Sequence, residues 1–205
     1  MNTTSATTPD ADLLRAMRKG DADAFAALYR RHQGPLYRFA LLRCGSSATA
    51  ADVVQEAFMG LLTERFRFDP LRGQLGPFLF GVARNLILKL EEGRRHLALP
   101  VFEAAEDGRG DGDDPEPDQP LDHHGPLARL LDNEAAEQVR RALAQLAPHY
   151  RDVVILYEMH ELSYAEIADI CQVDIGTVRS RLSRGRAALA KRLAGWQAAP
   201  DLAQA

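Results

Sequence analysis

Apolar residues recur along residues 10–95 at the three- and four-residue spacing typical of amphipathic helices. Asp21 is a candidate N-cap for one helix, and a longer apolar run around Leu36 follows it. A Gly-Ser-Ser sequence at 45–47 separates that run from a further helix over about 50–64. The pattern therefore predicts a helical N-terminal half.

Turn residues interrupt the pattern at 69–73, and the next helix is predicted to start with Pro77 in its first position and to run towards Arg94. Helical spacing resumes near Leu127 and continues in four segments to about Trp196. No stretch has the alternation of a strand. The predicted fold class is therefore all-α, with two small helical domains.

The two helical stretches are separated by residues rich in Asp, Gly and Pro. Such a stretch buries too little apolar surface to offset its ordering entropy, so it is expected to be a flexible linker. The predicted organisation is a disordered tail at 1–9, a domain at 10–95, an acidic linker at 96–126 and a second domain at 127–197.

Charge is unevenly distributed along the 205 residues, whose formal net charge is −4. The linker holds nine acidic residues against the single base Arg109, so the remainder of the chain carries about +4. DNA responds to the local field within about a Debye length, roughly 10 Å, rather than to the sum. The negative total therefore does not exclude a nucleic-acid partner.

The most informative stretch is 163–193, which has the spacing of a helix-turn-helix. Ser163 and Glu166 form a candidate capping box, so a short helix is predicted from Tyr164 to about Ile170. Asp174 is a second candidate N-cap, which opens another helix at 175.

That second helix is single-signed, with six basic residues and no acidic one between 175 and 193. An ordinary solvated helix face usually mixes signs, whereas a helix that enters the major groove uses Arg, Ser and Thr to contact bases and phosphates. The predicted DNA-contacting residues are Thr177, Arg179, Ser180, Arg181, Ser183 and Arg184.

Two separated motifs indicate a family. GTVRSRLSRGRAAL at 176–189 resembles the promoter-reading helix of sigma domain 4, and ADVVQEAFMGLL at 51–62 resembles the polymerase-docking helix of sigma domain 2. FDPLRG at 68–73 and FLFGVARNLIL at 78–88 are similar to the loop and helix that open the −10 element. With the linker in place of a middle domain, the chain resembles the extracytoplasmic-function (ECF) group of bacterial sigma factors.

The resemblance implies an alternative sigma factor that binds core RNA polymerase through its β′ clamp and β flap, recognises −35 and −10 promoter DNA, and has an anti-sigma factor. For −10 recognition and opening it implies Phe68, Arg72, Gly73, Gln74, Arg84, Asn85, Lys89, Arg94 and Arg95. For core polymerase docking it implies Asp52, Gln55, Glu56 and Phe58. Two alternatives remain open from the residues alone: a solvated face at 52–56, and a buried Asn85 that bonds only backbone.

Two positions depart from the family pattern. Phe78 stands where the family commonly has Trp, which loses the indole N–H donor. Gln172 stands where many helix-turn-helix turns have Gly, and a left-handed conformation there costs a non-glycine residue about 1 kcal/mol. A slightly different turn is one expectation that follows.

Rival functions find little support. An ordinary transcriptional regulator would account for the helix-turn-helix equally well, and binding to core polymerase distinguishes the two. For catalysis, His160-Glu161 lacks the second His of a zincin, and no phosphate-binding loop or nucleophile elbow occurs. We expect no enzyme activity, metal or cofactor, no membrane insertion, a cytoplasmic location, and Cys44 and Cys171 as ordinary reduced thiols.

Overall fold

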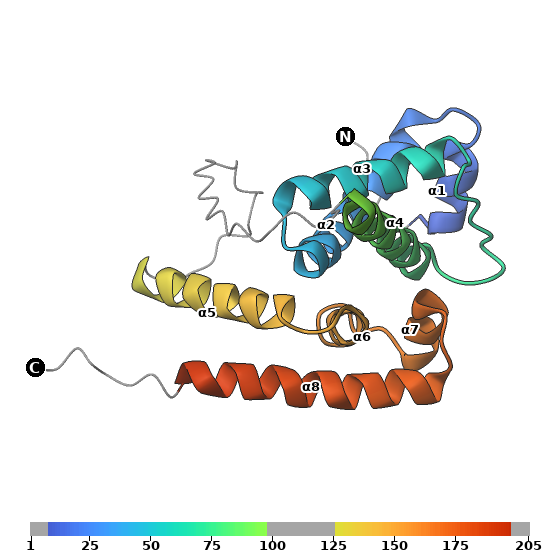
Figure 1. The fold of residues 1–205 in the computed structure, drawn as a ribbon. Helices are drawn as coiled ribbons and strands as arrows, with labels where there is room; N and C mark the ends of the chain where they lie inside the picture. The colour runs from blue at the N-terminus through green and yellow to red at the C-terminus, as the bar shows by residue number, and fades with distance from the viewer. Residues whose placement is uncertain (1–7, 98–125, 198–205) are drawn as a thin grey trace, which may run out of the picture.

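A computed structural model of the chain describes residues 8–97 and 126–197, with side chains described over 8–94 and 135–194. Within these ranges all regular structure is helical, which confirms the all-α prediction (Figure 1). The predicted linker lies almost entirely outside the described residues, as does most of the tail at 1–9.

Four helices form an N-terminal bundle: α1 (Asp10–Met17), α2 (Ala22–Cys44), α3 (Ser47–Leu62) and α4 (Leu75–Leu97). Four more form a C-terminal bundle: α5 (Pro126–Ala144), α6 (Pro148–Glu158), α7 (Tyr164–Cys171) and α8 (Ile175–Gln197).

Helix α2 is one continuous helix of 23 residues, although the sequence pattern indicated two runs and Pro35 lies inside it. An interior proline removes a backbone hydrogen bond and costs about 3 kcal/mol. Leu28 on one side of Pro35 and Leu36 and Phe39 on the other are all fully buried in the same core. Burying each such side chain contributes about 1.5–3 kcal/mol, which is enough to keep the helix intact across the proline.

Side-chain caps fix the ends of the N-terminal helices. The carboxylate of Asp21 accepts hydrogen bonds from the backbone N–H groups of Asp23 (2.9 Å) and Ala24 (3.0 Å), as predicted for an N-cap. Gly45 ends α2 in the left-handed conformation (φ 73°), and Ser46 caps α3, which begins at Ser47, three residues before the predicted start. Side-chain chemistry thus makes the sharp corner between α2 and α3.

Helix α4 begins at Leu75 and not at Pro77, so the predicted start was two residues late. Leu75 is 1 % exposed, and its burial extends the helix backwards by half a turn. Pro77 remains within the first turn, where its missing N–H group has no partner to lose.

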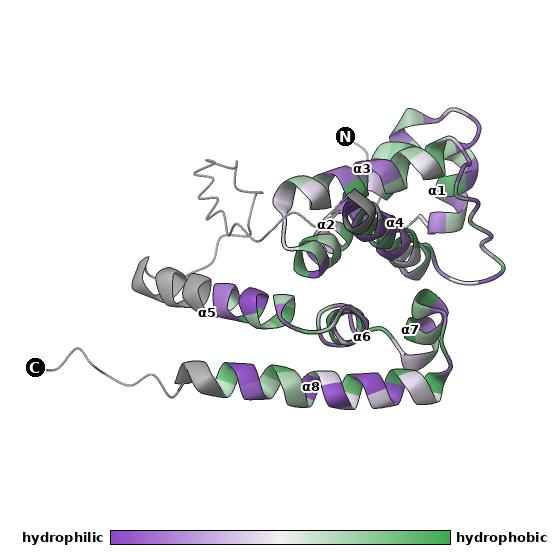
Figure 2. Ribbon diagram, in the orientation of Figure 1, coloured by the Kyte–Doolittle hydropathy of each residue, from purple (hydrophilic) through white to green (hydrophobic). Residues whose placement is uncertain are grey.

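Helix α8 is central to the C-terminal bundle, because it packs against α5, α6 and α7, and α6 also packs against α7. The first helical residue of α6 is Pro148. Figure 2 shows alternating apolar and polar bands along α8, as expected of an amphipathic helix. The buried core of the C-terminal bundle consists of Ala142, Leu143, Leu146, Val153, Val154, Ile155, Leu156, Ile167, Ala168, Ile170, Cys171, Val178 and Leu182.

The two bundles pack against each other, with α6 and α7 lying along α2 and α4 (Figure 1). At the centre of the contact, the carboxylate of Asp152 on α6 bonds the Nε atoms of Arg43 on α2 and of Arg84 on α4, the latter at 2.7 Å. Arg43 also forms a forked ion pair with Glu91 of α4, at 2.6 and 3.0 Å. The sequence pattern predicted two helical domains but did not indicate this contact between them.

Arg43 is fully buried, and Asp152 is 1 % exposed. Burial acts against the charged form of Arg43, but the hydrogen bonds that Arg43 donates to Glu91 and the negative charge of Asp152 outweigh this effect and raise the pKa of Arg43. Breaking a buried pair by removing one partner typically costs 3–5 kcal/mol, because a charge is then left uncompensated. These charges therefore hold the bundles in one defined relative position.

His160 lies beside this network, with its ring 4.5 Å from that of Phe80 and 6.2 Å from that of Phe39, centroid to centroid. Burial, with a smaller effect from the charge of Arg38, lowers the pKa of His160 to about 4. The imidazole is therefore neutral at physiological pH and serves as a packing group between the bundles.

We expect Gly185→Ala to destabilise the C-terminal bundle. A Cβ on Gly185 would lie 2.7 Å from Cγ2 of Val154 and 3.4 Å from the carbonyl oxygen of Tyr150, where α8 crosses α6. Overpacking of this kind costs about 1–3 kcal/mol, measurable by urea unfolding. Gly81→Ala is the control: its Cβ meets nothing within 4 Å, and we expect a gain of up to about 1 kcal/mol from helix propensity. Equal stability of the two variants would contradict the proposed crossing.

We expect His160 to make stability depend on pH between about 4 and 6.5. Its pKa in the folded chain, about 4, lies below the usual 6.5, so the unfolded chain takes up the proton first on acidification. The stabilisation is complete above pH 6.5 and is lost as the pH falls towards 4, by at most about 3 kcal/mol. In His160→Gln this part of the pH dependence should vanish from unfolding curves recorded over the same range. Parallel curves for wild type and variant would show that His160 is not the titrating group.

Candidate nucleic-acid interface

Helices α7 and α8 form the predicted helix-turn-helix. The capping box is present: the Ser163 hydroxyl accepts a hydrogen bond from the backbone N–H of Glu166 (3.3 Å), and the Glu166 carboxylate accepts one from the N–H of Ser163 (2.9 Å). Helix α7 ends at Cys171, one residue later than predicted, and the chain turns through 172–174 into α8.

The turn is made by Gln172 in the left-handed conformation (φ 56°, ψ 50°). The usual turn geometry is thus retained without glycine, and the expectation of a different turn was wrong. The side-chain amide of Gln172 donates a hydrogen bond to the carbonyl oxygen of Asp169 (2.5 Å), and its backbone N–H donates to that of Ala168. These bonds offset the strain of about 1 kcal/mol that a left-handed non-glycine residue carries.

Asp174 fixes the start of α8, as predicted. Its Oδ1 accepts the backbone N–H of Thr177 and its Oδ2 accepts the Thr177 hydroxyl, both at 2.8 Å. The hydrogen bonds from the hydroxyl and backbone of Thr177 lower the pKa of the Asp174 carboxyl. The Thr177 side chain is therefore held in one orientation at the N-terminus of the helix.

The outer face of α8 brings the six predicted DNA-contacting residues together. Val178 and Leu182 are buried on the inner face, so the intervening positions point outwards. Four are exposed (Arg179, Ser180, Ser183 and Arg184), and two are half-buried (Thr177 and Arg181).

The arginines of this face differ from Arg186, which is exposed but paired with residues of its own bundle. Arg186 pairs with Glu158 at 2.5 Å and lies over the ring of Tyr157. Among the described residues, no salt bridge involves Arg179, Arg181 or Arg184. Their charges are available to an anionic ligand, and helix α8 lies at the edge of the molecule, where Figure 1 shows no element covering its outer side.

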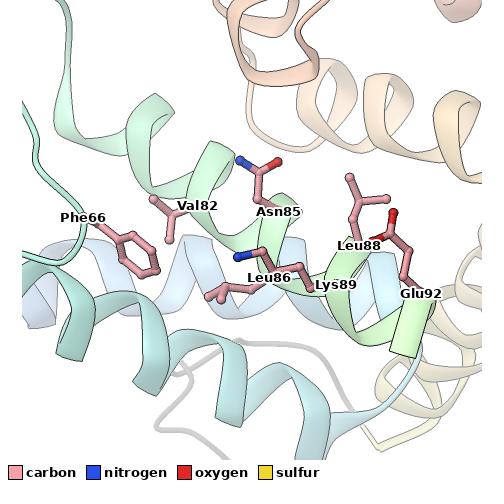
Figure 3. A pocket seen from close by; sticks show the side chains of 7 residues that line it. All are labelled: Phe66, Val82, Asn85, Leu86, Leu88, Lys89 and Glu92. Carbon is pink, nitrogen blue, oxygen red and sulfur yellow. The ribbon is translucent and has the colours of Figure 1, made fainter. Parts of the chain in front are cut away.

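A second set of predicted residues lies on and before α4. Asn85 is exposed, which removes the alternative of a buried Asn that bonds only backbone. It lies at a pocket of about 330 Å³, and Figure 3 shows Asn85 and Leu88 projecting from one side of α4, with Leu86 and Lys89 on another. The pocket is lined by Phe66, Val82, Asn85, Leu86, Leu88, Lys89 and Glu92.

The cations of α4 are in different situations. Lys89 and Arg94 are exposed, and Arg94 contacts the Thr49 hydroxyl at 3.4 Å. The side chain of Arg84 is only 13 % exposed, because Arg84 is paired with Asp152. The side chain of Arg95 lies outside the described residues.

The loop before α4 presents Arg72, Gly73 and Gln74 to solvent, with Gly73 at φ 154°. Phe68 is 7 % exposed, and its ring packs 5.2 Å from that of Phe78. In this conformation Phe68 therefore anchors the loop to the bundle rather than presenting a ring to a ligand.

Helix α3 presents the predicted docking edge. Asp52, Gln55 and Glu56 line a groove of about 500 Å³ between α3 and α4, together with Val53, Leu86, Lys89 and Leu90. Phe58 does not reach this edge: it is 2 % exposed, and its ring packs 4.8 Å from that of Tyr29.

Sequence reasoning missed two groups of residues. Met59, Leu62 and Leu90 are exposed apolar side chains on α3 and α4, and a hydrophobic pattern alone assigns such residues to the core. Asp152 and Arg43 are charges within apolar runs, YRDVVIL and ALLRC, which signals a buried ion pair. Only the tertiary structure identifies them as partners of each other.

The described residues contain no helix long and apolar enough to cross a membrane, and no cluster of three potential metal-ligating side chains. An exposed basic helix on a helix-turn-helix, preceded by a second bundle with its own polar groove, is typical of a helical DNA-binding protein.

Comparison with known proteins specifies that class. The family model "Sigma-70 region 2" matches residues 28–95, and the model "Sigma-70, region 4" matches residues 136–189. The chain is 32 % identical to the ECF RNA polymerase sigma factor SigM of Mycobacterium tuberculosis (strain H37Rv), over 90 % of this chain and 84 % of the relative. It is 28 % identical to the ECF RNA polymerase sigma factor SigW of Bacillus subtilis, over 88 % of this chain and 94 % of the relative. The chain belongs to the sigma-70 family of RNA polymerase sigma factors, in its ECF group.

Solved structures agree with the fold. CnrH, in complex with the cytosolic domain of CnrY, matches with a TM-score of 0.62 and 22 % identity, over 91 % of this chain and 97 % of that chain. The sigma factor RpoE from Bartonella quintana, in complex with the anti-sigma factor NepR, matches with a TM-score of 0.61 and 24 % identity, over 82 % and 96 %.

Proposed function

We propose that this chain divides promoter recognition between its bundles, with α8 reading the −35 element and α4 with the preceding loop opening and reading the −10 element. As an alternative sigma factor, the protein directs promoter-specific transcription initiation. In terms of the sequence, residues 10–95 and 127–197 act as the two recognition domains, and residues 96–126 act as the tether between them.

The observation that carries the proposal is the exposed, single-signed face of α8. Its arginines lack acidic partners among the described residues, and its Thr177 hydroxyl is oriented by Asp174 at the end that a recognition helix inserts into the major groove. Arg bonds guanine through two donors, and Ser or Thr bonds bases or phosphates. Positions near the helix start reach base edges, whereas those further along reach phosphates.

The pocket beside α4 supports the assignment to the −10 element. Strand opening needs a place for an unstacked base and cations for the exposed backbone. The pocket combines an exposed amide (Asn85), an aromatic ring (Phe66) and a cation (Lys89). The exposed loop residues Arg72, Gly73 and Gln74 border the same helix.

The groove between α3 and α4 is the proposed docking site for core polymerase. Its carboxylates suit a basic helix such as that of the β′ clamp, and exposed Leu90, Met59 and Leu62 add apolar area close by. The pair between Glu56 and Arg65 is half-exposed on both sides and so exchanges readily for a partner. The C-terminal bundle is assigned to the β flap by family resemblance.

We further propose an anti-sigma factor as a regulator, since two similar structures are described as complexes with CnrY and with the anti-sigma factor NepR. As a regulatory subunit of this family, the chain is proposed to act through binding alone, without a catalytic step of its own. Its place of work is the cytoplasm, where core polymerase and promoters meet.

The deciding experiment is in vitro transcription. Purified chain and core polymerase are incubated with a fragmented genomic library, and the transcript starts are sequenced. A sigma factor produces starts that share two upstream elements, whereas an ordinary regulator leaves core polymerase without specific starts.

We expect substitutions on α8 to separate base reading from phosphate binding. Arg184→Ala should change the preference for upstream-element sequences by about 1–3 kcal/mol, because a base-edge contact is lost. Ser180→Ala should act in the same direction. Lys191→Ala, further along the exposed side, should weaken all sequences alike and reduce the salt slope by about one. Competition binding with a library of upstream elements measures both effects, and an unchanged preference in Arg184→Ala would refute the assignment.

We expect Asn85→Ala to leave the folded chain and the closed promoter complex intact and to impair strand opening. The exposed amide has no buried partner to orphan, so the melting temperature should stay close to wild type. A template already mismatched over the −10 region should restore most of the activity, because the unstacking cost of a few kcal/mol is then already met. Failure of rescue together with a lowered melting temperature would show a structural role instead.

A further inference from the structure

Asp152 holds two arginines of the other bundle. One carboxylate oxygen bonds Nε of Arg43, and the other bonds Nε of Arg84 at 2.7 Å. The carboxylate is 1 % exposed, so both contacts are shielded from water and from salt screening. Asp152 thus concentrates the electrostatic attraction between the bundles on one residue.

Neighbouring groups complete the contact. Arg151, the preceding residue, donates a hydrogen bond to the backbone carbonyl oxygen of Arg43 (2.8 Å), and His160 packs on Phe80 and Phe39. Helices α6 and α7 therefore cover the faces of α2 and α4 that carry Arg43 and Arg84.

Arg84 is one of the cations assigned to the −10 strand. A carboxylate and a phosphate bind a guanidinium in the same manner, through charge-assisted N–H···O bonds. In this closed conformation the carboxylate of Asp152 bonds Nε of Arg84, and the Arg84 side chain is 13 % exposed. The guanidinium of Arg84 is therefore largely shielded from a DNA phosphate while Asp152 is bound to it.

The other two functional surfaces remain open in the same conformation. The outer face of α8 and the α3–α4 groove are exposed. The closed chain is thus able to meet core polymerase and a −35 duplex, whereas its −10 surface is incomplete.

The closed conformation also fails the geometry of a promoter. Elements two duplex turns apart are separated by about 70 Å. Packed helices such as α4 and α7 lie about 8–10 Å apart, axis to axis. The bundles must separate before both elements are read by one chain.

Separation leaves no charge both buried and without a partner. Arg43 keeps its forked ion pair with Glu91, which belongs to the same bundle, and Asp152 becomes hydrated. Arg84 is the group that loses its partner, and a DNA phosphate replaces it. The contact is therefore built to be exchanged rather than permanent.

We propose that Asp152 is an intramolecular latch that competes with the DNA backbone for Arg84 and keeps the free chain closed. The inference rests on the proposed function, since it takes the −10 strand as the competing ligand. Binding of single-stranded DNA at α4 and opening of the bundles are then one coupled event.

The test compares wild type with Asp152→Asn in the full chain. Asparagine keeps the shape of the side chain but removes the charge that holds both arginines. Glu158→Gln is the matched control: it lies on the same helix, and its ion pair with Arg186 stays within the C-terminal bundle. Two quantities are measured: the radius of gyration by small-angle X-ray scattering, and the affinity for a fluorescent 12-nucleotide single strand of mixed sequence.

We expect Asp152→Asn to have a larger radius of gyration than wild type and to bind the single strand at least about tenfold more tightly. The apparent dissociation constant rises as the open fraction falls, and a chain that is about nine-tenths closed loses tenfold in affinity. Glu158→Gln should match wild type in both measurements. Binding of a −35 duplex should be equal in all three proteins, because α8 is exposed throughout.

Two outcomes would overturn the latch: an Asp152→Asn chain as compact as wild type, or an expanded one that binds the single strand no more tightly. If the variant does not fold, the wild-type chain alone tests the proposal. Saturation with the single strand must then increase its radius of gyration, and a chain that binds the strand but stays compact refutes the latch. Failure of the proposed function would appear differently, as the absence of specific starts with core polymerase.

Discussion

A buried guanidinium must be paired, and in this chain that requirement fixes the relation between the two bundles. Arg43 is fully enclosed, and only a carboxylate can balance its charge there without a cost of several kcal/mol. It receives two: Glu91 from its own bundle and Asp152 from the other. The first makes the N-terminal bundle self-sufficient, and the second ties the bundles together. Because the two partners come from different bundles, the structure can close without making closure a condition of folding.

The C-terminal bundle positions its recognition helix by a different constraint, namely close packing. Gly185 allows α8 to approach α6 where a methyl group would strike Val154, and Asp174 fixes the first turn of the helix through Thr177. A groove-binding helix must be held to within a fraction of an ångström if its side chains are to reach base edges. Small residues and caps on the inner side therefore determine what the outer side can read.

Much of this architecture is predictable from sequence. Local signals are reliable where one side chain decides the outcome: Asp21, Ser163 and Asp174 cap helices as predicted. Predictions fail where tertiary burial overrides local preference, as with Pro35 inside α2 and Leu75 at the start of α4. The prediction for the turn fails for a local reason, since hydrogen bonds hold exposed Gln172 in the left-handed conformation. The exposed face of the basic helix α8 is predictable from helical periodicity, because the buried positions Val178 and Leu182 define the opposite face. Arg84 and Asp152 lie 68 positions apart in the chain, and no periodicity or motif predicts that they pair.

The role of an arginine in this protein is therefore set by its neighbours rather than by its charge. Arg186 and Arg184 are two positions apart on α8, yet one is engaged by Glu158 and Tyr157, whereas the other is exposed with no salt bridge among the described residues. Arg84 has the residue type and the helix expected for phosphate binding, but an internal carboxylate holds it. Since a carboxylate and a phosphate compete for the same donors, each such pair is a point at which DNA exchanges with the protein's own anion. A net charge of −4 is compatible with promoter binding for this reason: acidic groups can regulate individual cations without opposing the field of the recognition helix.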